Sequence, residues 1–211
     1  MTKRQLASVA KRVATKLGMF TSKGRLLVAL PLDHTLKAVI LDSSSYNADI
    51  FHAELFVQPL FIPERHIVLS VGWRVGGRAE TWSGHDPDLI ENLTTALAGE
   101  PCRFLSRIHS PADVAAAALS LNAAQNLGVQ RVVGFAFAKA GNTSRAIQEL
   151  TALLNLLGNR PGWEHEMAQQ TRWLINQLRD DPQAVVSQFK RWETETAQAL
   201  NVNELRSEQG H

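Results

Sequence analysis

The hydrophobic pattern of this 211-residue chain changes its period near Asp86, and this change constrains the fold more than any other feature. Before Asp86, segments rich in Val, Ile, Leu and Phe are separated by short turn sequences, which is typical of β-strands. After Asp86, apolar residues recur every three or four positions, which predicts amphipathic helices. A run of strands followed by a run of helices indicates an α+β fold.

No stretch between the predicted strands is long enough for a crossover helix, so neighbouring strands should pair in an antiparallel meander. The short link Asp33-His34 suits a hairpin. We expect four to five strands, over Arg25–Leu32, Thr35–Ser43, Ile50–Phe61, His66–Val75 and the short Arg78–Ser83. Pro59 and Pro63 lack a backbone N–H, so they should end or bend the third strand, or place it at an edge.

The N-terminal residues predict a basic amphipathic helix over 2–17, ended by Gly18. Its apolar positions share one face, and they are Leu6, Val9, Ala10, Val13, Leu17 and Phe20. Residues 1–25 hold seven Lys and Arg residues and no Asp or Glu. Because the whole chain has a formal net charge of +2, the remainder carries −5. We expect the apolar face to pack on the sheet, and docking on an anionic surface is the alternative.

Helix starts are marked by an N-cap residue followed by proline at the first helical position. This pattern occurs at Asp86-Pro87, Ser110-Pro111 and Asp181-Pro182. We expect helices near 87–98, 111–125, 129–140, 143–157, 162–179 and 182–200. The chain should therefore comprise a sheet region over 1–105 and an all-helical region over 106–200, which can share one core. The polar residues 201–211 should form a flexible tail.

Composition is that of an ordinary globular protein, with 45% hydrophobic and 20% charged residues. The single cysteine, Cys102, cannot form an internal disulfide, and there is no cysteine cluster to bind zinc, so a reducing compartment such as the cytoplasm is expected. No apolar run approaches the roughly 20 residues that span a bilayer. A net charge of +2 does not favour a nucleic-acid partner.

The sequence contains no glycine loop for phosphate, no Gly-x-Ser-x-Gly, no His-Glu-x-x-His and no paired cysteines. We therefore expect neither a metal nor a cofactor. Catalytic candidates come only from the alternation of side chains along two predicted strands. His52 and Glu54 share a face of one strand, and His66 and Arg74 share a face of the next. Together they could form an acid–base or anion site, or merely the solvated face of a one-sided sheet.

Residues 129–157 resemble one tetratricopeptide unit. The resemblance rests on Val133, Gly134, Phe137, Gly141, Ala146, Leu150 and Leu153. Gly134 and Ala146 would let two helices approach closely, and Gly141 would form the turn between them. No second copy lies 34 residues before or after this one, whereas stacked repeats normally need about three copies. We expect a local helical hairpin, which hints at a protein-binding surface.

Residues 2–105 also resemble a family of uncharacterised bacterial proteins, a domain of unknown function. The matching positions are Phe20, Lys23 and Gly24, the segment 57–63, Gly72 and Trp82. The resemblance implies an α+β fold and brings no catalytic residues.

Three functions are compatible with these observations. The first is a non-enzymatic protein-interaction or accessory module, comparable to an immunity protein, with a protein as its partner. The second is an enzyme that uses His52, Glu54, His66 and Arg74. The third is a binder of nucleic acid or of an anionic surface through the basic first helix. The absence of a catalytic motif favours the first, and nothing in the sequence indicates a particular oligomeric state.

Overall fold

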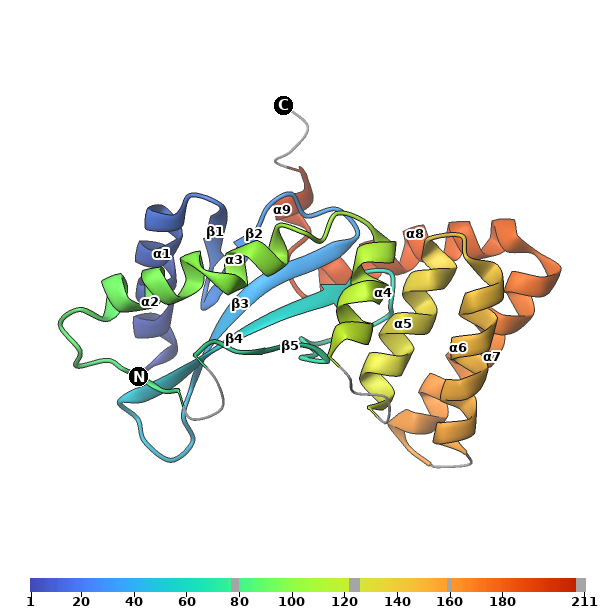
Figure 1. Cartoon of the computed structure of the whole chain (residues 1–211), viewed down its shortest axis with the longest axis horizontal. Helices are drawn as coiled ribbons and strands as arrows, with labels where there is room; N and C mark the ends of the chain where they lie inside the picture. Colours follow the sequence, from blue (N-terminus) through green and yellow to red (C-terminus); the bar gives the residue numbers. More distant parts are fainter. Residues whose placement is uncertain (77–79, 122–125, 159–160, 208–211) are drawn as a thin grey trace. The chain divides into compact units, whose positions relative to one another are not determined.

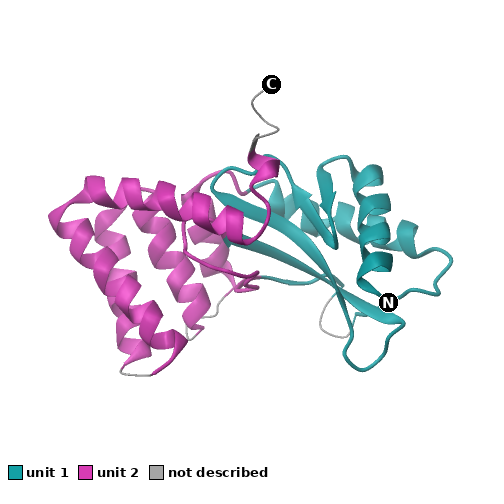
Figure 2. Cartoon of the chain, turned by 180° about the vertical axis from the view of Figure 1, so that it is seen from behind, with its two compact units in different colours: residues 1–58, 72–107 teal, residues 59–71, 108–211 magenta. Residues whose placement is uncertain are grey.

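A computed structural model of the chain describes residues 1–76, 80–121, 126–158 and 161–207 (Figure 1). The chain divides into two compact units (Figure 2). The sheet unit comprises residues 1–58 and 72–107, and the helical unit comprises residues 59–71 and 108–211. The predicted α+β fold is confirmed: an N-terminal helix precedes an antiparallel sheet, and helices fill the C-terminal half.

Helix α1 (Lys3–Leu17) opens the sheet unit and packs against strands β1, β2 and β3. It begins with a reciprocal capping box between Thr2 and Gln5 and ends at Gly18, whose φ of 69° suits glycine. Its buried residues are Leu6, Val9, Ala10, Val13 and Ala14. The predicted packing of the apolar face is therefore confirmed, except that Leu17 is only half-buried.

Six strands form the sheet. They are β1 (Phe20–Lys23), β2 (Leu26–Ala29), β3 (Thr35–Ser43), β4 (Ile50–Pro59), β5 (Val71–Arg74) and β6 (Trp82–Ser83). The spatial order β1-β2-β3-β4-β5 follows the chain, and β6 also pairs with β4, so the predicted meander is confirmed. The additional strand arises before Gly24, where β1 and β2 form a hairpin with Phe20 opposite Ala29.

Strand β4 ends at Pro59, as its missing N–H predicts, but β4 is not an edge strand because it pairs with β3, β5 and β6. The strand predicted over His66–Val75 is wrong for its first half, since β5 begins only at Val71. Residues 60–70 lie outside the strands, and the stretch 59–71 belongs to the helical unit. Of the last predicted strand, over 78–83, the residues at 78 and 79 lie outside the described residues.

Two helices complete the sheet unit, α2 (Leu89–Ala98) and α3 (Glu100–Leu105). Helix α3 was not predicted. The helix start predicted at Asp86-Pro87 is wrong by two residues, because the Asp86 side chain accepts a hydrogen bond from the backbone N–H of Asp88 (2.9 Å) and forms a turn instead.

The helical unit contains α4 (Pro111–Ser120), α5 (Leu127–Lys139), α6 (Thr143–Leu157), α7 (Trp163–Asp180), α8 (Pro182–Ala199) and α9 (Glu204–Ser207). Each helix from α4 to α8 packs on the next one along the chain. The predicted N-caps Ser110 and Asp181 are confirmed, because their side chains accept hydrogen bonds from the N–H groups of Asp113 and Ala184.

Two predicted boundaries differ from the structure. The helical unit starts at Ile108 rather than at 106, and it also takes in residues 59–71, which the sequence assigned to the sheet region. The predicted flexible tail contains α9, and its residues Val202 and Leu205 are buried. Residues 208–211 lie outside the described residues. No helix within the described ranges is long and apolar enough to cross a membrane.

Candidate functional site

The four catalytic candidates do not lie together on the sheet. His52 and Glu54 are on β4 and Arg74 is on β5, whereas His66 precedes β5 and belongs to the helical unit. Side-chain alternation was the only reason to group His66 with Arg74. That reason fails because residues 66–70 are not part of a strand.

Glu54 and Arg74 form a cross-strand ion pair. Val75 N donates a hydrogen bond to Ala53 O (2.8 Å), which places Arg74 directly opposite Glu54 on the neighbouring strand. Nε and Nη2 of Arg74 each lie 3.0 Å from Oε1 of Glu54. His52 Nδ1 lies 3.3 Å from the backbone oxygen of Glu80. These contacts give Glu54 and Arg74 a role in strand pairing that needs no substrate.

Among the other reactive groups in the described part of the chain, His85 Nε2 lies 3.3 Å from Asp49 Oδ1, and both side chains are exposed. No three His, Cys, Asp or Glu residues there are close enough to hold a metal ion. Cys102 is half-buried in α3, and burial raises the pKa of its thiol, which lowers the thiolate fraction available for nucleophilic attack.

Helix α1 presents a basic face to solvent. Lys3, Arg4, Lys11 and Arg12 are exposed and form no ion pair with the described residues. Lys16 pairs with Glu91 of α2. Because the apolar face of α1 is already buried, this helix has no free apolar surface to insert into a bilayer.

Helices α5 and α6 form the close hairpin that the tetratricopeptide-like pattern predicts. A Cβ atom at Gly134 would lie 2.5 Å from Cδ2 of Leu150, so only glycine allows this approach without movement of Leu150. Ala146 is fully buried one turn away from Leu150. Gly141 adopts a φ of 80° at the turn between the two helices.

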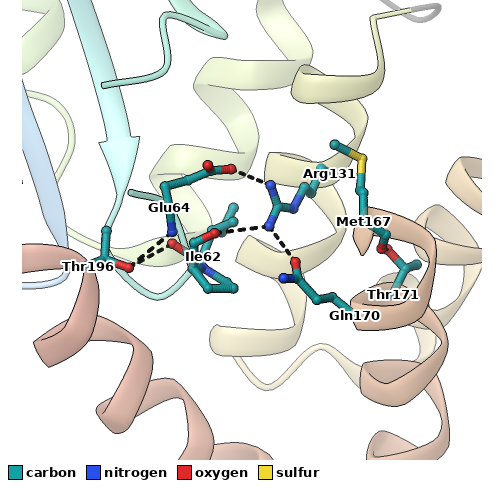
Figure 3. A network of polar contacts seen from close by, with 8 residues as sticks. Ile62, Glu64, Arg131, Met167, Gln170, Thr171 and Thr196 are labelled. Atoms are coloured by element: carbon teal, nitrogen blue, oxygen red, sulfur yellow. Dashed lines mark hydrogen bonds and ion pairs between the residues drawn. The ribbon is translucent and has the colours of Figure 1, made fainter. Parts of the chain in front are cut away.

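A partly buried polar network holds residues 62–64 within the helical unit (Figure 3). We call it the anchor network, and its side chains are those of Glu64, Arg131, Gln170 and Thr196. Arg131 of α5 pairs with the Glu64 carboxylate. Its Nη2 donates hydrogen bonds to Pro63 O (3.3 Å) and to Gln170 Oε1 of α7 (2.7 Å).

Thr196 of α8 binds the same stretch of backbone from another side (Figure 3). Its hydroxyl donates a hydrogen bond to Ile62 O (3.1 Å) and accepts one from Glu64 N (3.4 Å). Side chains of α5 and α8 therefore contact three successive backbone positions, the oxygens of Ile62 and Pro63 and the nitrogen of Glu64.

Arg131 is only 7% exposed, and its charge is balanced inside the unit. Burial lowers the pKa of the guanidinium, and the Glu64 carboxylate raises it in opposition. An arginine remains charged under these conditions, so its environment must compensate the charge. The Phe135 ring assists, with its centroid 5.5 Å from Cζ of Arg131. Nε of Arg131 is buried and has no hydrogen-bond partner among the described residues.

Apolar contacts surround the anchor network. Leu60, Phe61 and Ile62 are buried, and the Phe61 ring meets the edge of Phe189 of α8 at a centroid distance of 5.7 Å. Phe189 in turn contacts Phe135, at 6.5 Å. Residues 60–64 thus supply three apolar side chains, one carboxylate and a backbone that the helices recognise directly.

Sequence reasoning missed this site, although two features pointed to it. Arg131 is the one charged residue of α5 before Lys139, in a helix that is otherwise nearly all apolar. Pro63-Glu64 directly follows an apolar run that is too long for β4 alone. A lone arginine in an apolar helix indicates a buried partner, but the identity of that partner depends on the tertiary fold.

Comparison with known protein families, with characterised proteins and with solved structures gave no match. The resemblances of residues 2–105 and 129–157 therefore stay predictions, and the function is argued from this chain alone.

Proposed function

We propose that this chain is a non-enzymatic protein-interaction or accessory module whose helical unit binds a partner protein in the cytoplasm. The observation that carries the proposal is Trp163, which is 61% exposed in the first turn of α7. Tryptophan is enriched among the residues that dominate binding energy at protein interfaces. Its large ring gains apolar burial when a partner covers it.

The surroundings of Trp163 support an interface. One turn along α7, Met167 is buried in an apolar cluster with Leu153, Leu157 and Ala168. Leu156, in the last turn of α6, is 38% exposed. Exposed apolar side chains therefore lie next to the buried apolar cluster where α6 ends and α7 begins. The cores of protein interfaces are likewise rich in apolar and aromatic residues.

The architecture of the helical unit fits a binding role as well. Its helices α4 to α8 pack consecutively, as do the helices of repeat proteins that act as binding scaffolds. Its most buried charged groups are engaged in structural contacts, as Arg131 is with Glu64 and Gln170. Fold alone does not assign function, so the proposal rests on the exposed tryptophan.

Affinity capture from a lysate of the native cells, read by mass spectrometry, tests this proposal. Trp163→Ala should reduce recovery of a bound protein roughly 30-fold, as expected for loss of an interface hot spot. Tyr46→Ala is the matched control, because Tyr46 is also a highly exposed aromatic residue but lies between β3 and β4 of the sheet unit. Equal recovery with the two variants, or recovery of nucleic acid in place of protein, would contradict the proposal.

The basic face of α1 favours a second candidate, a site for an anionic surface. Its support is the acid-free sequence of residues 1–25 together with the exposure of Lys11 and Arg12. Removing both charges with Lys11→Gln and Arg12→Gln should then weaken binding to DNA or to anionic lipid vesicles, with less effect at high salt. Titrations at two salt concentrations measure this effect, and unchanged binding at low salt would exclude this candidate.

A further inference from the structure

We propose that α5, α7 and α8 form a receptor site for an extended protein segment, and that residues 59–71 of the same chain occupy this site until a partner segment displaces them. The partner segment has the chemistry of residues 60–64: consecutive large apolar residues, then proline, then an acidic residue. The inference deepens the proposed function and rests on it for the existence of a partner.

The first argument is the way in which the segment is bound. Residues 61–70 form neither helix nor strand, so their backbone groups depend on other partners. The Thr196 hydroxyl and the Arg131 guanidinium supply such partners at Ile62, Pro63 and Glu64. Because these contacts address the backbone, an extended segment of another chain can form them equally well.

The second argument is the chemistry of the side chains. Phe61 fills a place against Phe189, and Leu60 and Ile62 are buried beside it. The Glu64 carboxylate compensates the buried charge of Arg131. A segment without an acidic residue at the last position would leave the buried Arg131 without its ion-pair partner, which is unfavourable. The site therefore selects for an acidic residue that follows the apolar ones.

The third argument concerns exchange. Residues 60–64 make the contacts named above, whereas Arg65 and His66 are exposed and Leu69 is 48% exposed. A partner that supplies the same apolar groups and carboxylate replaces these contacts one for one. After the exchange, Arg131 is again paired with a carboxylate. The state with the chain's own segment bound and the state with the partner segment bound can therefore be close in free energy.

The covalent connection of residues 59–71 to β4 and β5 favours the intramolecular state. A tethered segment acts at an effective concentration of the order of millimolar or higher, so a free peptide should bind the wild-type chain weakly. Any change that weakens the chain's own segment raises the fraction of open sites and tightens the apparent affinity for a free peptide by the same factor.

A fluorescent synthetic peptide with the sequence of residues 58–66, titrated with the full chain and followed by anisotropy, tests the inference. Phe61→Ala removes an anchor from the chain's own segment but not from the peptide. The peptide should bind this variant at least roughly tenfold more tightly than it binds the wild type. A peptide of the same composition in scrambled order is the control, and it should bind neither protein.

Receptor-side changes sharpen the test. Thr196→Val keeps the size of the side chain but removes both backbone hydrogen bonds, so in the Phe61→Ala background it should weaken peptide binding roughly three- to tenfold. Glu64→Gln, which opens no cavity, serves as the weakened segment if Phe61→Ala fails to fold. Equal binding to wild type and variant, or no binding to a variant that melts cooperatively, would overturn the inference.

The result is separable from that of the proposed function. None of the hydrogen bonds and ion pairs named above for the anchor network involves Trp163, so Trp163→Ala should leave peptide binding unchanged. If Trp163→Ala loses partner capture and the peptide does not bind Phe61→Ala, the receptor site is refuted and the proposed interaction function stands. Peptide binding without any captured protein would leave the receptor site standing and remove the interaction function.

Discussion

The two units use charge in different ways. In the sheet unit, the pair Lys16–Glu91 leaves its side chains 47% and 66% exposed. In the helical unit, the pair Lys139–Glu193 leaves them 14% and 5% exposed, with 2.7 Å between the charged atoms. Exposed pairs contribute about 0–1 kcal/mol, whereas breaking a buried pair costs about 3–5 kcal/mol. The ion pairs Lys16–Glu91 and Arg25–Asp42 of the sheet unit are thus more exposed than the pairs Lys139–Glu193 and Arg131–Glu64 of the helical unit.

This difference teaches what each unit tolerates. The sheet unit depends on apolar burial between α1 and the strands, so it should resist the loss of a surface charge and fail when a charge enters its core. The helical unit already holds compensated charges in its interior, so it should fail when one member of such a pair is removed. The following substitutions separate these two behaviours, starting with the largest expected effect.

Val13→Asp should destabilise the sheet unit by roughly 5 kcal/mol. Val13 is fully buried in α1, so the change removes apolar burial and also places an unpaired charge in the core. Urea denaturation followed by circular dichroism measures the effect. The matched control, Lys11→Gln with Arg12→Gln on the exposed face of the same helix, should change the free energy of unfolding by only about 0–1 kcal/mol. A stable Val13→Asp protein would show that α1 does not contribute to the core.

Glu64→Ala should destabilise the helical unit by about 3–5 kcal/mol, because it leaves the buried Arg131 without its carboxylate. Glu91→Ala, which breaks the exposed pair with Lys16, should cost about 0–1 kcal/mol. Comparable losses for the two variants would remove the contrast between the units. Replacing both Glu64 and Arg131 by apolar residues of similar size should restore most of the stability, since such exchanges are often neutral.

Helices that are determined by residues close together in the sequence were predictable. Helix α6 occupies the predicted residues 143–157, and α1 differs by one residue at its start, because apolar spacing and capping residues determine helices within a few turns. The close contact of Gly134 with α6 also followed from a local pattern of small residues.

The candidate site was not predictable in the same way. Arg131 and Glu64 are 67 positions apart in the sequence, so no local pattern joins them. The alternation over His66–Val75 resembled a strand, yet strand β5 covers only residues 71–74, and the preceding residues belong to the helical unit. A periodic pattern predicts which side chains share a face only if the backbone adopts the assumed conformation. At residues 66–70, tertiary contacts and not the local pattern determine the backbone conformation.

Gly134→Leu should destabilise the helical unit by about 1–3 kcal/mol through overpacking against Leu150. Ala152→Leu is the matched control, because Ala152 is exposed on α6 and has room for a larger side chain. That change should stay within about 0.5 kcal/mol of the wild type. Thermal melting of both variants measures the difference, and an unchanged melting temperature for Gly134→Leu would show that the two helices are farther apart than the structure places them.

The smallest expected effect compares two capping boxes, a charged one in the helical unit and a neutral one in the sheet unit. At the start of α4, the Asp113 carboxylate accepts hydrogen bonds from the N–H groups of His109 (3.0 Å) and Ser110 (2.9 Å). At the start of α1, Thr2 and Gln5 form the corresponding box without a charge. Asp113→Asn and Thr2→Ala should each cost about 1 kcal/mol near neutral pH.

Their pH dependences should differ. The hydrogen bond from His109 N–H, followed by that from the Ser110 hydroxyl, lowers the pKa of Asp113 below its ordinary value of 3.8. A carboxyl whose pKa is lower in the folded state stabilises the fold above its unfolded pKa, and this stabilisation is lost as the pH falls through the folded pKa. Urea denaturation from about pH 5 to about pH 2 should therefore show the difference between wild type and Asp113→Asn shrinking below the ordinary pKa. The difference for Thr2→Ala should stay constant over the same range, because neither side chain of that box titrates there. A difference for Asp113→Asn that is independent of pH would mean that the shape of the side chain, and not its charge, caps α4.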